Sequence, residues 1–195
     1  LACAIHGIDQ AQIRSGQKVL VIGGGTIGLI MVQLAKLVGA SVVVLSEPIQ
    51  MRREISLRVG ADAAVDPLNE NLSEKFYELT GQEGADIVIE CVGKPSAVEQ
   101  ALQMAGYGAT VLLFSVPPVG AVVHLPLFDV FQKELRIVGS MINPDTHERA
   151  VNLINSNRIE LECLITHSYG LADVEEAVLM QMSSQSIKVV VHPQE

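Results

Sequence analysis

The sequence contains no tryptophan, and only 4% of its 195 residues are aromatic. Basic residues are also few, since 13 Lys and Arg against 22 Asp and Glu give a formal net charge of −9. A protein that binds nucleic acid without regard to sequence needs clustered Lys and Arg to displace phosphate counterions, so this class is excluded. The mean hydropathy of +0.36 excludes a disordered polar tail.

Cysteine is scarce as well. The three cysteines, Cys3, Cys91 and Cys163, lie far apart and fit neither a disulfide framework nor a CxxC metal or redox pair, so a reducing cytoplasm is the expected compartment. No apolar run reaches the roughly 20 residues needed to cross a bilayer, and the first ten residues carry no export signal. Because the sequence begins at Leu1, within a helical pattern, we expect it to be part of a longer protein.

From residue 18 to residue 139, short β-branched runs alternate with longer amphipathic or apolar segments. This alternation is typical of βαβ units and a parallel sheet. Most of the runs are continuously apolar, as strands covered on both faces must be. The six expected strands are 18–23, 41–46, 63–66, 86–91, 109–114 and 135–140. Six is the full number for a Rossmann sheet, so we predict an α/β fold with a doubly wound, six-stranded parallel sheet.

Helices are expected between these strands, and glycines mark where they end. The expected helices are 26–38, 51–59, about 70–79, 95–104 and about 127–133. Gly39, Gly60, Gly81 and Gly106 each follow such a segment, where a glycine in the left-handed conformation can end a helix. The helix over 26–38 is apolar nearly all round and is expected to be buried.

A second block of elements follows the last strand of the expected sheet. Asn143 and Pro144 predict the start of a helix, as an N-cap residue followed by a helix-compatible proline, and this helix is expected to end near Ser156. A strand near 164–169, a helix over 172–182 and a last strand, KVVVH, come next. The length suggests one domain with an appendage, so we expect a Rossmann domain over 1–142 and a C-terminal α/β appendage over 143–195.

The strongest motif lies directly after the first expected strand, at the beginning of the following helix. Gly23, Gly25 and Gly28 form the pattern G-x-G-x-x-G. In this context Gly23 permits a tight turn, Gly25 lets the backbone approach a pyrophosphate, and Gly28 lets the helix pack close to the strand. The phosphates would lie on free N–H groups at the positive end of the helix. No lysine follows the last glycine, which disfavours a nucleotide-triphosphate P-loop.

An acidic residue is expected about 20 positions further on, where it accepts hydrogen bonds from the adenosine ribose hydroxyls. Glu47 lies 47 − 23 = 24 positions after Gly23, and its charge would repel a 2′-phosphate, which favours NAD over NADP. Arg52 and Arg53 argue the other way, because arginines just past this strand could neutralise such a phosphate. Two alternatives stay open: a tight turn that binds no nucleotide, and a surface Glu47 paired with one of the arginines.

Together these residues resemble the medium-chain dehydrogenase/reductase superfamily, and within it the zinc-dependent alcohol and polyol dehydrogenases of the sorbitol, butanediol and threonine dehydrogenase type. The resemblance covers nearly the whole chain. It rests on LACAIHGID, VIGGGTIGL, VVVLSEPIQMRREISLRVGAD, IVIECVG, SVPP, and ITHSYGLADVEEA leading to KVVVHP. It implies that residues 1–142 form an NAD-binding Rossmann domain. It also implies that residues 143–195 return to a GroES-like catalytic domain that would precede Leu1 and carry the zinc.

The resemblance further implies where the cofactor lies. The expected binding residues are Gly23, Gly25, Thr26, Ile27 and Gly28 at the pyrophosphate, Glu47 and Arg52 at the adenosine ribose, Val92, Gly93, Ser115, Val116, Ser140, Met141 and Ile142 at the nicotinamide, and Lys188 near the pyrophosphate. A solvated charge on a strand is an equal alternative for Lys188. No catalytic residue and no metal ligand is assigned in this chain, because the five histidines are scattered singly, without ligand spacing.

The expected function is NAD binding within a zinc-dependent alcohol or polyol dehydrogenase, in which hydride passes from the alcohol to NAD. The chain alone is expected to be inactive. Two alternatives remain, a zinc-free NADPH-dependent quinone or enoyl reductase and a non-enzymatic NAD-sensing module. A short-chain dehydrogenase is excluded, because no tyrosine is followed by a lysine four residues later. Since the apolar sixth strand would lie at a sheet edge, we expect a homodimer or homotetramer formed through residues 121–140.

Overall fold

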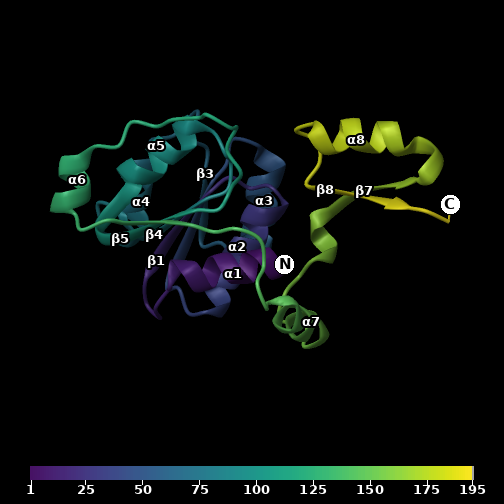
Figure 1. The fold of residues 1–195 in the computed structure, drawn as a ribbon, viewed down its shortest axis with the longest axis horizontal. Coiled ribbons are helices and arrows are strands. Elements are labelled where there is room, and N and C mark those ends of the chain that lie inside the picture. The colour runs from purple at the N-terminus through teal and green to yellow at the C-terminus, as the bar shows by residue number, and fades with distance from the viewer. Residues whose placement is uncertain (195) are drawn as a thin grey trace.

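The computed structural model describes residues 1–194, which contain a six-stranded sheet and a separate two-stranded sheet (Figure 1). The larger sheet is parallel and has the strand order β3-β2-β1-β4-β5-β6, so the predicted doubly wound Rossmann sheet is confirmed. Its strands are β1 (Lys18–Ile22), β2 (Val42–Ser46), β3 (Ala63–Val65), β4 (Ala85–Glu90), β5 (Ala105–Leu113) and β6 (Arg136–Gly139).

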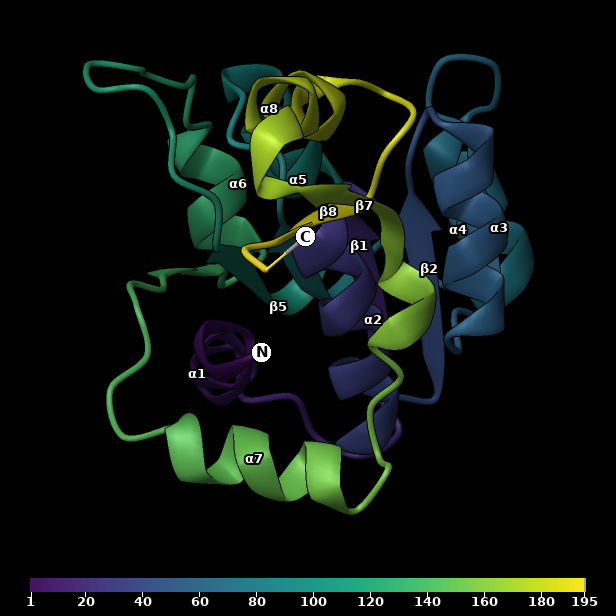
Figure 2. The ribbon, with the colours of Figure 1, turned by 90° about the vertical axis from the view of Figure 1, so that its right-hand side faces the viewer.

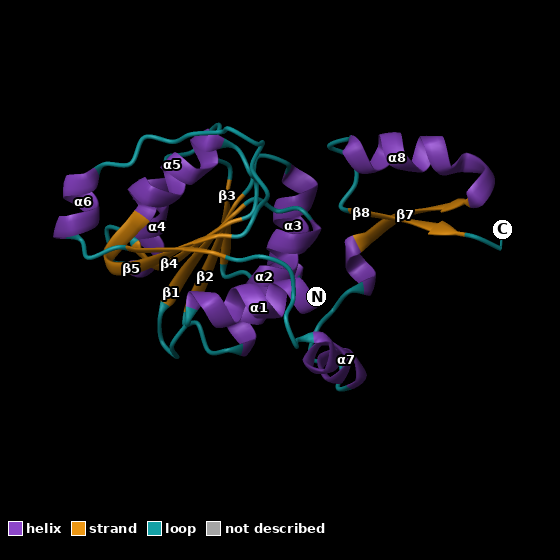
Figure 3. Ribbon diagram, in the orientation of Figure 1, coloured by secondary structure: helices purple, strands orange, loops and turns teal. Residues whose placement is uncertain are grey.

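Helices cover both faces of this sheet (Figures 1 and 3). They are α1 (Ala2–Ala11), α2 (Thr26–Leu37), α3 (Gln50–Arg58), α4 (Leu72–Thr80), α5 (Pro95–Met104) and α6 (Leu127–Gln132). One core lies between the sheet and α1, α2 and α3, and a second lies between the sheet and α4 and α5. In β1, Val19 and Val21 belong to the first core, whereas Leu20 and Ile22 belong to the second. Side chains alternate between the two faces of a strand, so two covered faces require an uninterrupted apolar run.

The glycines that follow the helices differ in their structural role. Gly39, Gly60 and Gly81 have positive φ and follow α2, α3 and α4, as predicted. The prediction for Gly106 is wrong, because this residue lies within β5. A Cβ added there would lie 3.1 Å from the carbonyl oxygen of Gly84. A close approach of two backbone segments, and not a helix end, therefore requires the small residue at this position.

The second block begins with α7 (His147–Asn155), which packs against α1 (Figure 2). The predicted helix start at Asn143 and Pro144 is wrong. Asp145 has a φ of 55°, which is not helical, and the helix begins only after Thr146. The hydroxyl of Thr146 donates a hydrogen bond of 2.8 Å to the carbonyl oxygen of Ala2, so a contact with the first helix fixes where α7 starts.

The smaller sheet lies beside the Rossmann sheet and carries α8 on one side (Figures 1 and 3). It consists of the parallel strands β7 and β8, joined through α8, in the predicted order of strand, helix and strand. The bounds of this part are η1 (Glu162–Leu164), β7 (Ile165–Gly170), η2 (Leu171–Asp173), α8 (Val174–Met182) and β8 (Lys188–His192). In residues 1–194, no helix combines the length and the apolar character needed to cross a membrane.

Candidate functional site

A cavity of about 590 Å³ lies at the carboxyl ends of β1, β2 and β4. In the sheet β1 lies between β2 and β4, and this is the topological switch point, where doubly wound sheets bind their ligands. Five of the residues expected from the sequence line this cavity: Gly23, Gly25, Glu47, Arg52 and Val92. Three separate loops of the chain therefore contribute expected residues to one site.

In the glycine turn between β1 and α2, Gly23 and Gly28 are closely packed, whereas Gly25 borders open space. Gly23 has a φ of 98°, and a Cβ added to it would lie 2.7 Å from Cγ2 of Val92. A Cβ on Gly28 would lie 1.8 Å from the carbonyl oxygen of Gly23, so helix and turn are in direct backbone contact. Around Gly25, by contrast, a Cβ would meet no heavy atom within 4 Å. Open space therefore lies beside the first N–H groups of α2, which have no acceptor within the helix.

Glu47 follows β2 and is buried, with 4% of its surface exposed. Its Oε2 accepts a hydrogen bond of 2.6 Å from the N–H of Gly24, and its Oε1 accepts one of 2.9 Å from the N–H of Ile49. No ion pair of this side chain occurs among the described residues, so the alternative of a surface carboxylate paired with an arginine is wrong. Each carboxylate oxygen can accept a further hydrogen bond, which leaves capacity for ribose hydroxyls.

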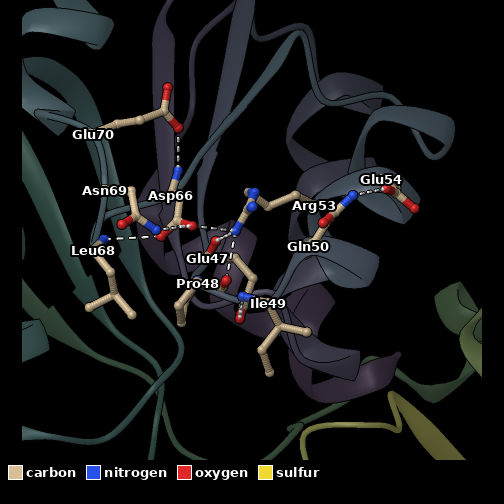
Figure 4. A network of polar contacts seen from close by, with 10 residues as sticks. All are labelled: Glu47, Pro48, Ile49, Gln50, Arg53, Glu54, Asp66, Leu68, Asn69 and Glu70. Atoms are coloured by element: carbon tan, nitrogen blue, oxygen red, sulfur yellow. Dashed lines mark hydrogen bonds and ion pairs between the residues drawn. The ribbon is translucent and has the colours of Figure 1, made fainter.

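The guanidinium of Arg53 contacts the loops after β2 and β3 (Figure 4). Its Nη1 donates hydrogen bonds to the carbonyl oxygens of Glu47, at 2.8 Å, and of Pro48, at 2.7 Å. The same nitrogen lies 3.2 Å from Oδ2 of Asp66. Arg53 is not among the described residues that line the cavity. The guanidinium thus stabilises the turn after β2 through contacts with the protein.

Asp66, at the end of β3, completes this polar network (Figure 4). Its carboxyl group accepts hydrogen bonds of 3.0 Å from the side-chain amide of Asn69 and from the N–H of Leu68. These two donors, together with the charge of Arg53, hold the pKa of Asp66 below its ordinary value. The N–H of Asp66 in turn donates to Glu70 at 2.8 Å. The loop after β3 is thereby tied to the loop after β2.

Two residues that line the cavity each carry a polar atom without a partner in the described part of the chain. The two atoms are Nε of Arg52 and Oγ of Ser46, and both are buried. Buried polar groups in folded proteins are nearly always hydrogen-bonded, to protein or to solvent. Ser46, Glu47 and Arg52 line the same cavity, and a hydroxyl, a carboxylate and a guanidinium group together suit a ligand rich in hydroxyls, such as a ribose. The residues present therefore fit the adenosine half of a dinucleotide.

The segment before β8 contacts the amino end of α2 and the start of α3. The hydroxyl of Thr26 donates a hydrogen bond of 2.7 Å to the carbonyl oxygen of Ile187, and Nη2 of Arg52 donates one of 2.7 Å to that of Ser186. Lys188, the next residue, is exposed. Lys188 thus directly follows two residues whose carbonyl oxygens accept from Thr26, at the start of α2, and from Arg52, which lines the cavity.

The loops after β4 and β5 lie against one another, since a Cβ on Gly93 would lie 3.1 Å from the carbonyl oxygen of Val116. Glu90, which the sequence analysis did not single out, connects them. Its Oε1 accepts hydrogen bonds from the N–H groups of Val92, at 2.6 Å, and Gly93, at 2.8 Å, and its Oε2 accepts one from the hydroxyl of Ser115. A signal was present in the sequence, because Glu90 is a charged residue at the end of an apolar strand expected to be buried.

Four further residues expected at the cofactor, Ile27, Ser140, Met141 and Ile142, do not line the cavity. Ile27 is half-buried in α2 and packs against the first core. Ser140 follows β6, and its Oγ is buried without a partner in the described residues. Met141 and Ile142 are exposed, and neither is among the residues that line the cavity. The structure therefore does not bring these two side chains to the cavity.

The His, Cys, Asp and Glu side chains of the described residues do not cluster, and the cysteines are unpaired. Residues 1–194 contain no group of three or more His, Cys, Asp or Glu side chains that could hold a metal ion, and the three cysteines described are free. Cys91 lines the cavity, but burial, reinforced by the neighbouring charge of Glu90, raises the pKa of its thiol far above the ordinary value. A thiol in that state is a poor nucleophile.

The fold and the glycine turn define a doubly wound Rossmann domain of the kind that binds its ligand at the switch point. Residues 26–156 match the family described as zinc-binding dehydrogenase. The chain belongs to this family, which confirms the resemblance found in the sequence. The match covers most of the chain and includes the strands β2 to β6 and the helix α7.

Relatives and solved structures agree with this assignment. The chain is 34% identical over 199 residues to a sorbitol dehydrogenase of Halalkalibacterium halodurans, with 99% of this chain and 57% of that protein covered. It is 32% identical over 195 residues to D-arabinitol dehydrogenase 1 of Uromyces fabae, with 98% and 56% covered. A protein of Sinorhizobium meliloti, provisionally named a zinc-binding dehydrogenase and solved with bound NADP, superposes with a TM-score of 0.93 at 38% identity, with 98% and 57% covered. The chain thus spans little more than half the length of these relatives.

Proposed function

We propose that this chain binds NAD and forms the cofactor-binding part of an enzyme that oxidises a secondary alcohol or a polyol. The observation that carries the proposal is the cavity at the switch point, where the open position at Gly25 and the buried carboxylate of Glu47 lie together. The names of the sorbitol and D-arabinitol dehydrogenases support the polyol class. When bound, NAD supplies the acceptor for a hydride, and the residues of this chain bind and orient it.

The pyrophosphate belongs on the amino end of α2. The N–H groups of Thr26, Ile27 and Gly28 begin this helix, and the open space at Gly25 leads to them. We also assign Lys188 to the pyrophosphate, and the support is that it directly follows Ile187, whose carbonyl oxygen accepts from Thr26. The adenosine ribose belongs beside Glu47, with Nε of Arg52 as an additional donor.

The nicotinamide belongs at the loops after β4, β5 and β6. We place it against Val92 and Gly93, against Ser115 and Val116, and near Ser140, Met141 and Ile142. The contact between Gly93 and Val116 supports the first two loops as one surface. For the third loop the support is the unpartnered buried hydroxyl of Ser140.

We propose NAD as the cofactor, because a 2′-phosphate on the adenosine ribose would bring a second negative charge beside the buried Glu47. Arg53 supports this choice, because its guanidinium already contacts Glu47, Pro48 and Asp66. Of the two arginines that could neutralise a 2′-phosphate, it is therefore the less available one. A second candidate is an NADPH-dependent reductase. It is favoured by the NADP in the Sinorhizobium meliloti structure and by the unpartnered Nε of Arg52.

We propose that residues 1–142 form the cofactor domain and that residues 143–195 return to a catalytic domain outside this chain. The exposed apolar side chains of Val178, Leu179 and Met182 on α8 support a docking role for the second segment. The zinc ligands would lie in that catalytic domain, so the chain alone would bind cofactor without turning over substrate. Its free cysteines suit a cytoplasmic location.

The test is a calorimetric titration of the chain with NADH, repeated on Gly25→Leu. Gly25 has a φ of −69°, which any residue adopts, so the leucine is expected to project into the cavity without strain in the turn. Binding to the wild-type chain and its loss in the variant, at an unchanged melting temperature, would support the proposal. If the wild-type chain binds neither NADH nor NADPH, the proposed function is wrong.

A further inference from the structure

Glu90 is a completely buried carboxyl group that has no assigned role in binding the cofactor. It ends β4, and its exposed fraction is 0%. Its two side-chain oxygens together accept hydrogen bonds from the N–H groups of Val92 and Gly93 and from the hydroxyl of Ser115. Burying a carboxyl group is costly in free energy unless the group is hydrogen-bonded. The three donors offset this cost, and the carboxyl group in turn satisfies the two N–H groups and the hydroxyl.

The main chain of Glu90 holds the same two loops. Its carbonyl oxygen accepts hydrogen bonds of 3.1 Å from the N–H of Phe114 and 3.3 Å from that of Ser115. One residue at the end of β4 thus bonds both the loop that follows its own strand and the loop that follows the neighbouring strand β5. Gly93, in the loop after β4, has a φ of 83°, and a Cβ on it would lie 3.1 Å from the carbonyl oxygen of Val116 in the other loop.

We propose that Glu90 is a positioning residue, which fixes the loops over 91–94 and 114–118 in the arrangement that binds the nicotinamide end of the cofactor. The inference rests on the proposed function and adds to it. Glu47 holds the glycine turn through the N–H of Gly24, and Glu90 holds the nicotinamide loops through Val92, Gly93 and Ser115. Two buried acidic residues thus preorganise opposite ends of one crevice, and each is expected to affect a different half of the ligand.

The separation into two halves gives a direct test with two ligands. ADP-ribose contains the adenosine, the pyrophosphate and both riboses but lacks the nicotinamide ring, whereas NADH is complete. We expect Glu90→Leu to weaken NADH binding at least about tenfold, equivalent to about 1.4 kcal/mol. Its affinity for ADP-ribose is expected to stay within about twofold of the wild-type value, since the hydrogen bonds of Glu47 and Arg52, which we place at the adenosine end, do not involve Glu90.

Glu90→Gln is the conservative control. The amide oxygen can still accept from the N–H groups of Val92 and Gly93, and the amide nitrogen can donate to the hydroxyl oxygen of Ser115. We therefore expect this variant to recover most of the NADH affinity and the emission spectrum of bound NADH, which reports the surroundings of the nicotinamide. A merely structural role would not move that spectrum independently of the melting temperature.

Equal losses of NADH and ADP-ribose in Glu90→Leu would overturn the inference, as would unchanged binding of both. If Glu90→Leu does not fold, Glu90→Asp shortens the side chain that bonds the three donors, and its selective loss of NADH is expected to be about threefold, while equal losses would again overturn the proposal. A wild-type chain that binds neither ligand would overturn the proposed function and this inference with it. Normal wild-type binding without a selective loss in the variants would overturn this inference alone.

Discussion

The carboxylate of Glu47 accepts a hydrogen bond of 2.6 Å from the N–H of Gly24, so the end of β2 is tied directly to the glycine turn after β1. A Cβ on Gly24 would lie 2.8 Å from Cγ of Glu47 and 3.1 Å from its Oε2. Gly24, the middle glycine of the run 23–25, thus has a structural role that differs from those of Gly23 and Gly25. It lets a buried acidic side chain reach the backbone of the turn, which sets the position of the charge that a cofactor would meet.

Gly24→Ala is therefore expected to displace Glu47 without removing it. We expect the preference for NADH over NADPH to fall by about threefold to tenfold, because the carboxylate moves away from the site of a 2′-phosphate. Titration with both cofactors measures this ratio. An unchanged ratio, together with an unchanged affinity for NADH, would contradict the role given to this contact.

The second and third glycines of the G-x-G-x-x-G pattern, Gly25 and Gly28, separate binding from stability. Gly28→Ala places a Cβ 1.8 Å from the carbonyl oxygen of Gly23, so we expect a loss of about 1–3 kcal/mol in the free energy of unfolding from overpacking. Gly25→Ala meets no atom within 4 Å, and we expect weaker NADH binding with little change in stability. Chemical denaturation and NADH titration of both variants test the pair. Equal destabilisation by the two substitutions would contradict this account of the turn.

The lowered pKa of Asp66 predicts that the stability of the fold depends on pH. This pKa is lowered in the folded chain, with the Asn69 amide as the largest cause, from an ordinary value of 3.8. The group therefore stabilises the fold fully above that value, and its contribution is lost as the pH falls through the lower, folded pKa. Relative to Asp66→Asn, the wild-type advantage in unfolding free energy is expected to be constant above about pH 5 and to shrink below about pH 4.

Urea denaturation of the two chains across this range checks the prediction. Asn69→Ala removes the strongest donor to Asp66, so it is expected to bring the pKa of Asp66 back toward 3.8. The pH range over which the Asp66 contribution to stability is lost is then expected to become narrower. A difference between Asp66→Asn and the wild type that stays constant down to about pH 2.5 would show that the titration of Asp66 does not contribute to stability.

The free edge of the larger sheet predicts self-association. In the described residues β6 pairs only with β5, and the preceding segment exposes Val122, Phe128 and Phe131. We expect sedimentation at high micromolar concentration to show a dimer or tetramer, and Phe131→Glu to shift it toward the monomer. Leu179→Glu changes a similarly exposed residue on α8 and is expected to leave the assembly intact. A wild-type monomer would contradict the prediction.

The sequence predicts the sheet well because its signals are local. Uninterrupted apolar runs mark strands that are covered on both faces, and the glycines at 39, 60 and 81 end helices through their own backbone conformation. The start of α7 could not be predicted in this way, since it depends on Asp145 and on a bond between Thr146 and Ala2, 144 residues apart.

The site was predictable in part for the same reason. The glycine turn and Glu47 have a fixed spacing, and the structure brings them to one cavity. Arg52 and Arg53 look equivalent in the sequence, but neighbours on a helix point about 100° apart, and only Arg52 reaches the cavity. Glu90 was missed because its role depends on Ser115, 25 residues further along the chain.

The most direct test of the central claim is the affinity of the chain for NADH and for NADPH, measured by calorimetry and repeated on Glu47→Ala. We predict tighter binding of NADH by the wild-type chain and a preference that disappears in the variant, because the buried carboxylate would both accept from the ribose and repel a 2′-phosphate. Tighter binding of NADPH by the wild-type chain would contradict it and would assign Arg52 to the phosphate. Binding of neither cofactor would contradict the proposal that this crevice is a dinucleotide site.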